Sequence, residues 1–257
     1  MRYIQRFDSA STEQAAIDAG QLGKPYIAFI EDGQYIDWNT KSPQSADTRL
    51  IATYNVTTTG NTKIFGRNIA PGNVVAKIEL EDGTEIPGGY YYSFPTTGIQ
   101  KVFVTLKDRP YGQYPGKEVL SIMFLNCGNL VDIYIPEGVT LIESESFEGC
   151  KGLTSVTIPD SVQAITNGIN FSSCSNIKDV HIGSGIKELG NQVFWGCTLL
   201  SAITITAVTP PTIGNQVLLG ADNAYFYVPD EAVAAYKAAS TWASYVDRVK
   251  GISEKPQ

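Results

Sequence analysis

Residues 147–162 read FEGCKGLTSVTIPDSV, and close variants of this phrase occur three more times in the second half of the chain. The variants are FLNCGNLVDIYIPEGV from residue 124, FSSCSNIKDVHIGSGI from residue 171 and FWGCTLLSAITITAV from residue 194. The phenylalanines lie 23, 24 and 23 residues apart, and a cysteine follows each of them by three residues. Such a period indicates a repeat architecture. The repeated aromatic and thiol residues are Phe124, Cys127, Phe147, Cys150, Phe171, Cys174, Phe194 and Cys197.

The length of the repeat predicts one coil of a solenoid for each copy. An alternating pair such as Val156-x-Ile158 is typical of a short strand with one buried face. A coil of about 23 residues cannot bury its own apolar face, so neighbouring coils must stack on it. Stacking brings equivalent residues about 4.8 Å apart, as in a parallel sheet. The sequence therefore predicts a β-rich solenoid with internal ladders of phenylalanine and cysteine.

The phrase F-x-x-C-x-x-L-x-x-V-x-I-P-x-x-V resembles the BspA-like leucine-rich-repeat family, which occurs on surface proteins of gut and oral bacteria. The resemblance is close at residues 147–162 and extends over roughly residues 94–220. The third and fourth copies depart from it, because Gly183 and Thr206 stand where the first two have proline. The resemblance implies a leucine-rich-repeat fold, a cell-surface or secreted location and adhesion to host or neighbouring cells.

The 257-residue chain is long for one domain, and its patterns divide it into three parts. Residues 110–257 contain the leucine-rich-repeat solenoid and its cap. Residues 46–109 alternate between apolar and polar positions with turn residues between them, which predicts a small antiparallel β-sandwich-like module. Its ending YSFPTTGIQKVFVTLKD looks immunoglobulin-like. Residues 99–106 could instead form the first strand of the solenoid, or could join the two domains.

Residues 1–45 show the pattern of an αβ segment. A linker is expected over residues 39–48, where it overlaps the end of this segment. The signals are a strand at residues 2–7, a capping box at Ser11 and Gln14 that opens a helix to about Gly20, and a hairpin across Asp32 and Gly33.

Residues 225–251 predict a strand followed by a helical cap over the last coil. Asp230 is the expected N-cap of the helix, and Gly251 is the expected end of the helical segment. Tyr236 and Trp242 lie on the apolar face of this pattern, which indicates that the cap covers the exposed end of the core.

Composition argues against several classes of partner. The net charge of −7 disfavours nucleic acid and anionic membranes, which require a basic face. No apolar run reaches the roughly 18 residues of a membrane span, so we expect no membrane insertion. Residues 1–11 lack the apolar core of a signal peptide, which leaves the compartment open. We expect no cofactor, because the sequence contains no phosphate loop, nucleotide fingerprint or zincin motif.

The four cysteines are expected to be buried thiols that act as small hydrophobic residues. No close C-x-x-C pair suggests a metal site. A disulfide between neighbouring coils is the alternative, because the distance between stacked residues alone would allow it.

The polar residues of the repeat give little support to catalysis. His181 is the chain's one histidine, and Asp179 lies two residues from it on the same strand, about 7 Å away. Asp132 and Asp179 occupy equivalent positions two coils apart, roughly 9–10 Å, near the upper limit for an inverting glycosidase pair. Nothing in the sequence indicates that this face is shielded from water, so we expect no enzyme.

The outward-facing strand positions form the predicted ligand face. Alternation places on it Asp132, Tyr134, Ser155, Thr157, Asp179, His181 and Thr204. Lys101 and Phe103 would extend this face if residues 99–106 were the first repeat strand. The face predicts a non-catalytic interaction or adhesion module whose partner is a protein or glycan on host or neighbouring cells.

Two alternative functions remain. One is a carbohydrate-binding accessory protein with the β module as its sugar site, in which strand alternation turns one or two of the three tyrosines at residues 90–92 outward and Tyr90 or Tyr92 is expected to stack on the sugar. The other is a structural component of a phage or mobile-element assembly.

Overall fold

The structure is a computed structural model, and the chain divides into two compact units, residues 1–47 and 48–257. In the first unit it describes four strands. In the second it describes residues 48–67, 75–107, 116–119, 122–166 and 168–256. The predicted division into three parts at residues 45 and 109 stays a prediction.

The first unit contains a four-stranded sheet with the order β1-β2-β3-β4. The strands are β1 (Arg6–Phe7), β2 (Ile27–Ile30), β3 (Tyr35–Asp37) and β4 (Ser42–Gln44). β2 and β3 pair antiparallel, as the predicted hairpin requires. β4 pairs with β3 inside the predicted linker, so that part of the linker prediction is wrong. The helix expected from Ser11 to Gly20 lies outside the described residues.

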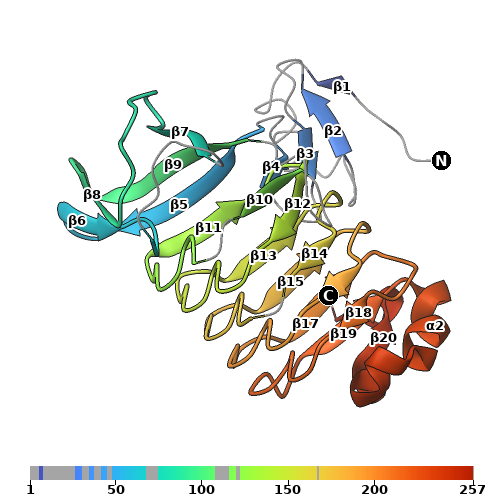
Figure 1. Ribbon diagram of the computed structural model, residues 1–257. Helices are drawn as coiled ribbons and strands as arrows, with labels where there is room; N and C mark the ends of the chain where they lie inside the picture. Colours follow the sequence, from blue (N-terminus) through green and yellow to red (C-terminus); the bar gives the residue numbers. More distant parts are fainter. Residues whose placement is uncertain are drawn as a thin grey trace. The chain divides into compact units, whose positions relative to one another are not determined.

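The second unit begins with antiparallel strands (Figure 1). One sheet has the order β11-β5-β9-β7, and a second pairs β6 with β8. The bounds are β5 (Leu50–Val56), β6 (Gly60–Lys63), β7 (Val75–Leu80), β8 (Tyr91–Phe94), β9 (Gly98–Leu106) and β11 (Leu130–Tyr134). β9 lies antiparallel between β5 and β7, so it is not the first strand of the parallel repeats. The immunoglobulin-like assignment stays a prediction.

The repeats contribute strands to two parallel sheets, except that β11 of the first copy pairs with β5 and lies outside the front sheet. The front sheet contains β13 (Ser155–Ile158), β15 (Asp179–Ile182), β17 (Ala202–Ile205), β19 (Tyr225–Val228) and β20 (Val249–Gly251). The back sheet contains β10 (Lys117–Val119), β12 (Val139–Ile142), β14 (Ala164–Ile165), β16 (Glu188–Leu189) and β18 (Thr212–Ile213). Equivalent repeat positions lie side by side: Val156 pairs with Val180, which pairs with Ile203.

The repeated phenylalanines form a continuous stack between the sheets. The ring centroids of Phe124 and Phe147 lie 5.3 Å apart, those of Phe147 and Phe171 4.9 Å, and those of Phe171 and Phe194 5.7 Å. The rings are close to parallel, with interplanar angles of 9°, 5° and 19°. All four phenylalanines are fully buried. A stack of this kind requires one aromatic residue at the same position of every coil, which the period of the sequence provides.

The repeated cysteines are free thiols in this core, and all four are fully buried. Each of the last three donates its S–H to a phenylalanine carbonyl of the preceding coil: Cys150 to Phe124 at 3.1 Å, Cys174 to Phe147 at 3.1 Å and Cys197 to Phe171 at 3.0 Å. Burial raises the pKa of the Cys127 and Cys197 thiols to about 12. The disulfide alternative therefore finds no support in the structure.

These thiols should react slowly in the native protein, because the reactive thiolate is almost absent near neutral pH at a pKa of about 12. We expect slow labelling by a thiol reagent in buffer and rapid labelling of all four cysteines in denaturant. Mass spectrometry without a reducing agent counts the labels. Fewer than four labels after unfolding would reveal a disulfide and contradict the free-thiol core.

Glycine recurs immediately before the repeated cysteines because the backbone there has a left-handed conformation. Backbone φ at this position lies between 56° and 71° in Asn126, Gly149, Ser173 and Gly196, and Gly220, which precedes Ala221 in the next coil, has a φ of 78°. The left-handed conformation favours glycine. This conformation directs the backbone N–H of the residue along the stack. The Gly149 N–H, for example, donates to the Ser172 carbonyl of the next coil at 2.8 Å. A Cβ on Gly149 would lie 2.2 Å from Asn126 Oδ1, so a side chain there would also require the Asn126 side chain to move.

The region predicted as a β module at residues 46–109, called the module below, closes the first end of the phenylalanine stack. The repeat pattern did not predict this closure. Phe65 is fully buried, and its ring centroid lies 5.7 Å from that of Phe124. Gly66 follows, and its N–H donates to the Met123 carbonyl at 2.7 Å. Tyr54 is also fully buried nearby and donates its hydroxyl to the Ile64 carbonyl. The first coil is thus covered by aromatic residues that lie outside the repeats.

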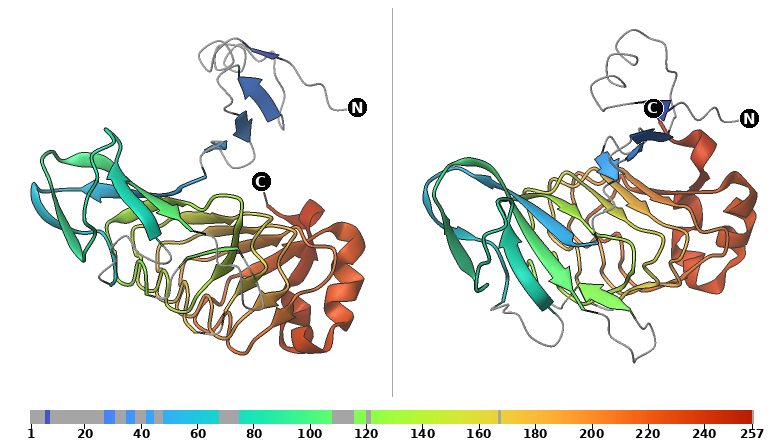
Figure 2. Two further views of the ribbon diagram at one scale, coloured as in Figure 1. Left: turned by 45° about the horizontal axis from the view of Figure 1, so that its top comes forward. Right: turned by 90° about the horizontal axis from the view of Figure 1, so that it is seen from above.

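The other end is covered by short helices and one further strand, and Figure 2 shows them opposite the module strands. The helices are η1 (Asp230–Ala232), α2 (Val233–Ala238), η2 (Ser240–Arg248) and η3 (Ile252–Glu254). Tyr236 donates to the Ala207 carbonyl at 2.8 Å, Trp242 Nε1–H donates to the Pro211 carbonyl at 2.7 Å, and Val217 N–H donates to the Tyr245 hydroxyl at 3.0 Å. The cap therefore supplies apolar surface and partners for backbone groups of the last coil.

Two details of the predicted cap are wrong. Pro229, and not Asp230, is the N-cap of the first helical turn, which has no side-chain cap. The Asp230 carboxylate instead accepts hydrogen bonds from the N–H and the hydroxyl of Ser253, at 3.2 Å and 2.9 Å. Gly251 does not end a helix, because η2 stops at Arg248 and Gly251 pairs with Val228 in the front sheet.

Candidate functional site

The predicted ligand face lies on the outer side of the front sheet and of β11. Within the front sheet, Ser155 pairs with Asp179 in one row, and Thr157 pairs with His181 in the next. Thr204 of β17 continues the second row beside His181. Ser155 is exposed, and Thr157, Asp179 and His181 are half-buried. These residues, together with Asp132 and Tyr134, are called the outer strip below.

The outer strip continues onto the module by a route that the repeat did not predict. β11 pairs antiparallel with β5 and belongs to the module sheet, so Asp132 lies opposite Thr53 and Tyr134 opposite Ile51. β9 follows on the far side of β5, where Lys101 pairs with Thr53 and Phe103 with Ile51. Lys101 and Phe103 therefore extend the face through β5 and not as a first repeat strand.

The environment of Asp132 differs from that of a fully solvated carboxylate. Desolvation by the surrounding sheet raises the pKa of Asp132 above its ordinary value. A hydrogen bond from the Ile133 backbone and the positive charge of Lys101 act in the opposite direction. A cation beside Asp132 would stabilise its ionised form and so lower this pKa.

The C-terminal segment covers the far end of the outer strip. The Lys255 ammonium donates to Asp179 Oδ2 at 2.7 Å and to Thr204 Oγ1 at 2.9 Å. Thr204 is 6% exposed, and Tyr227 beside it in β19 is 3% exposed. Of the predicted ligand-face residues, Thr204 is thus the one that is buried. No local pattern could have revealed this, because Lys255 lies 51 residues further along the chain.

Tyr225 and Lys250 complete this end of the face, and sequence reasoning did not include them. The Lys250 ammonium lies 4.0 Å from the centroid of the Tyr225 ring, within the range of a cation–π contact. Tyr225 pairs with Ala202 and so lies in the row of Asp179. The spacing could have found Tyr225, because it follows Ala202 by 23 residues.

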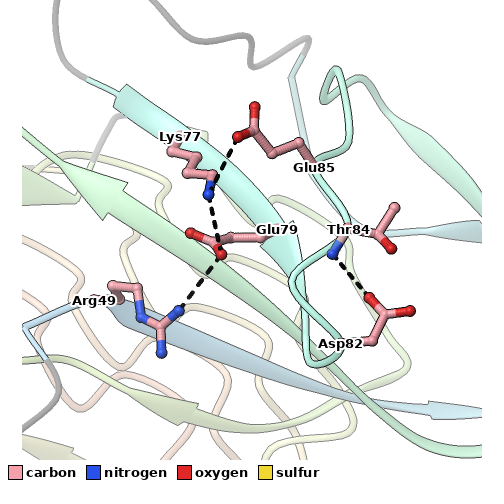
Figure 3. A network of polar contacts seen from close by, with 6 residues as sticks. All are labelled: Arg49, Lys77, Glu79, Asp82, Thr84 and Glu85. Atoms are coloured by element: carbon pink, nitrogen blue, oxygen red, sulfur yellow. Dashed lines mark hydrogen bonds and ion pairs between the residues drawn. The ribbon is translucent and has the colours of Figure 1, made fainter.

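Figure 3 shows a charged network on the module sheet. Glu79 is 12% exposed and lies 3.3 Å from Lys77 and 3.8 Å from Arg49, while Lys77 also contacts Glu85 at 3.2 Å. Hydrogen bonds to Glu85 and then Glu79 raise the pKa of Lys77. The Arg49 guanidinium also lies over the Phe103 ring at 4.3 Å. The network joins Arg49, the residue before β5, to β7 and β9, and its positive and negative charges alternate, which favours a structural role.

The three consecutive tyrosines are not equivalent. Tyr90 and Tyr91 are 49% and 58% exposed. Tyr92 packs edge-on against Phe94, with ring centroids 4.9 Å apart, and is partly buried against the core. The rings of Tyr90 and Tyr91 are therefore accessible to a stacked sugar, whereas the ring of Tyr92 is partly covered.

Catalytic and metal-binding arrangements gain no support from this geometry. Asp179, the residue shared by both catalytic hypotheses, holds Lys255 in an ion pair. Among the residues that the structure describes, no three histidine, cysteine or acidic side chains gather as metal ligands would. In the same part of the chain, no helix has the length and apolar content needed to cross a bilayer.

The residues of the stacked coils match a known protein family. Residues 117–235 match the family described as BspA type leucine rich repeat region, in six copies. These residues are a BspA-type leucine-rich repeat region. The BspA-type region begins at β10 and ends within α2, whereas the resemblance predicted residues 94–220. BspA-type repeats are commonly protein-interaction modules and often surface-associated. No curated protein matches the chain.

Proposed function

We propose that the protein is a non-catalytic interaction module that adheres through its outer strip to a protein on a host or neighbouring cell. The observation that carries the proposal is the outward polar face of β13 and β15, together with that of β11, which lies beside β13 and pairs with β5 of the module sheet. This face offers acceptors at Asp132 and Ser155, a hydroxyl at Thr157 and rings at Tyr134 and His181.

The proposal includes the architecture that presents this face. The parallel register of both sheets and the continuous phenylalanine stack support a solenoid, and Phe65 supports the module as its first cap. A stack of this kind is preorganised, so a partner can bind without the loss of conformational entropy that ordering a loop would entail. Extended surfaces of stacked repeats commonly bind partners in this way.

A specific observation also favours the carbohydrate-binding alternative. Tyr90 and Tyr91 expose 49% and 58% of their surface on the module. Exposed aromatic rings of this kind can stack on the apolar faces of sugars. This site lies on β8 and the residue before it, so the two candidate functions use different residues and one experiment can separate them.

The test is binding of the purified protein to an array of host matrix proteins and glycans, beside a Tyr134→Ala/His181→Ala double variant. We expect the wild-type protein to bind a protein on the array and the double variant to lose at least about tenfold in affinity, as happens when central contacts are removed. A Tyr91→Ala variant is the matched control, because it removes an aromatic residue outside the outer strip.

Each other outcome has a distinct meaning. Binding to a glycan that is lost in Tyr91→Ala but retained in the double variant would overturn the proposal in favour of carbohydrate binding. Binding that both variants retain would place the interaction elsewhere. Circular dichroism of each variant shows that a loss of binding is not a loss of fold.

A further inference from the structure

We propose that the outer strip binds a lysine or arginine side chain of its partner at Asp179, and that the C-terminal segment carrying Lys255 is an intramolecular competitor for this position. The inference rests on the proposed function, since it names the chemistry of the partner for the same face. Its starting point is a cation already bound there: the Lys255 ammonium, held by Asp179 and Thr204.

The position that Lys255 occupies has the features of a site for an ammonium group. Asp179 supplies a carboxylate oxygen at 2.7 Å, and the buried hydroxyl of Thr204 supplies a second acceptor at 2.9 Å. These two residues belong to adjacent strands, β15 and β17, whose register is fixed by the parallel sheet. The backbone positions of both acceptor residues are therefore set by the sheet.

The segment is anchored up to the residue before Lys255. The Asp230 carboxylate binds the N–H and hydroxyl of Ser253, and the Glu254 carboxylate accepts the Gly251 N–H at 3.0 Å. Lys255 itself follows these anchors and reaches the outer strip through its long side chain. Its ammonium can therefore leave Asp179 while β20 and the cap stay in place.

The contact is also weak enough to be displaced. The side chains of Lys255 and Asp179 are 27% and 47% exposed, so water screens their attraction. Ion pairs of this kind contribute little to stability. A partner displaces Lys255 when its own cation at Asp179 and its further contacts with the strip together outweigh this one ion pair.

Charge complementarity determines the kind of partner. The chain has a net charge of −7, and the outer strip contains Asp132 and Asp179. Lys101 and Lys250 stand at its two ends, the first beside Thr53 and the second over the Tyr225 ring. A protein segment with a basic residue flanked by small polar or apolar residues fits this pattern, whereas an acidic segment has no group that can replace the Lys255 ammonium at Asp179.

The experiment measures the affinity of blocked hexalysine and hexaglutamate peptides for the full chain at low ionic strength, where surface charges are least screened. The variants are Lys255→Ala, Lys255→Ala/Asp179→Asn and Lys237→Ala. Lys237 is exposed in α2, so its removal changes the net charge equally without touching the strip.

We expect Lys255→Ala to bind hexalysine about threefold more tightly than Lys237→Ala, the change that corresponds to releasing one exposed ion pair. Adding Asp179→Asn should abolish this gain, and hexaglutamate should show no gain. Equal affinities of Lys255→Ala and Lys237→Ala would overturn the inference, and so would a gain that survives Asp179→Asn.

This result is independent of the test of the proposed function. One outcome is that Lys255→Ala binds hexalysine more tightly while the double variant Tyr134→Ala/His181→Ala binds the array partner as well as the wild type does. In that case the cation site is confirmed and the proposed adhesion face is wrong. If the array partner needs Tyr134 and His181 but Lys255→Ala shows no gain, the proposed function stands and the competitor role of Lys255 fails.

Discussion

Replacing Phe171 with alanine is expected to lower the free energy of unfolding by about 3–5 kcal/mol. Phe171 is fully buried, and its ring stacks on Phe147 at 4.9 Å and on Phe194 at 5.7 Å. Alanine would leave a cavity in the middle of the phenylalanine stack. Because each coil of a repeat protein is stabilised mainly by its two neighbours, this one cavity weakens the interfaces on both sides.

Urea unfolding of the wild-type and variant proteins, followed by far-ultraviolet circular dichroism, measures this loss. Leu199→Ala is the matched control, because Leu199 is an apolar residue of the next coil that is 52% exposed. We expect the control to change stability by no more than about 0.5 kcal/mol. A loss below about 1 kcal/mol for Phe171→Ala would mean that the stack does not hold the coils together.

The core of the repeats could be predicted because its signals are local and recur. The interval between phenylalanines sets the length of a coil, and the alternation of Val156 and Ile158 shows which side of the strand is buried. The same alternation placed Asp179 and His181 outward, where the structure has them half-buried. Four repetitions of one phrase thus determined both the ladder and most of the outer strip.

The two ends of the stack could not be predicted in the same way. Phe65 lies outside the repeated phrase, so only its tertiary contact with Phe124 reveals that it extends the ladder. Val249 continues the apolar spacing of the preceding helix, so this spacing predicts a helical segment that ends at Gly251. A signal for β20 did exist, since Val249 follows Phe226 by 23 residues, the period of the repeat, and pairs with it.

The covered end of the outer strip shows a second limit of sequence reasoning. Alternation gives the direction of a side chain from its strand, but it cannot say what lies above that side chain. Thr204 points outward as predicted and is nevertheless 6% exposed, because η3 and Lys255 return across the sheet. Such coverage depends on a contact between residues far apart in the chain, so the sequence of the strand itself carries no signal for it.

Trp242→Ala is the second change expected to lower stability by about 3–5 kcal/mol. Trp242 is fully buried in the cap, where its ring packs edge-on against Phe226 at 4.9 Å and Tyr236 at 4.8 Å. Its Nε1–H also donates to the Pro211 carbonyl at 2.7 Å, so the change leaves a buried acceptor without this donor.

Two further variants and one local measurement make the Trp242 prediction specific. Trp195→Ala, at a residue that is 41% exposed, should cost less than about 1 kcal/mol, whereas Trp242→Phe should keep most of the packing and lose about 1 kcal/mol with the hydrogen bond.

Hydrogen exchange should show lost protection first in β19 and β17, next to the cap, while β13 stays protected, because stability in stacked repeats passes between neighbours. Equal losses for Trp242→Ala and Trp195→Ala would show that the cap does not stabilise the coils. Uniform loss of protection would instead show that the coils unfold as one unit, so that the cap protects the last coil no more than it protects the first.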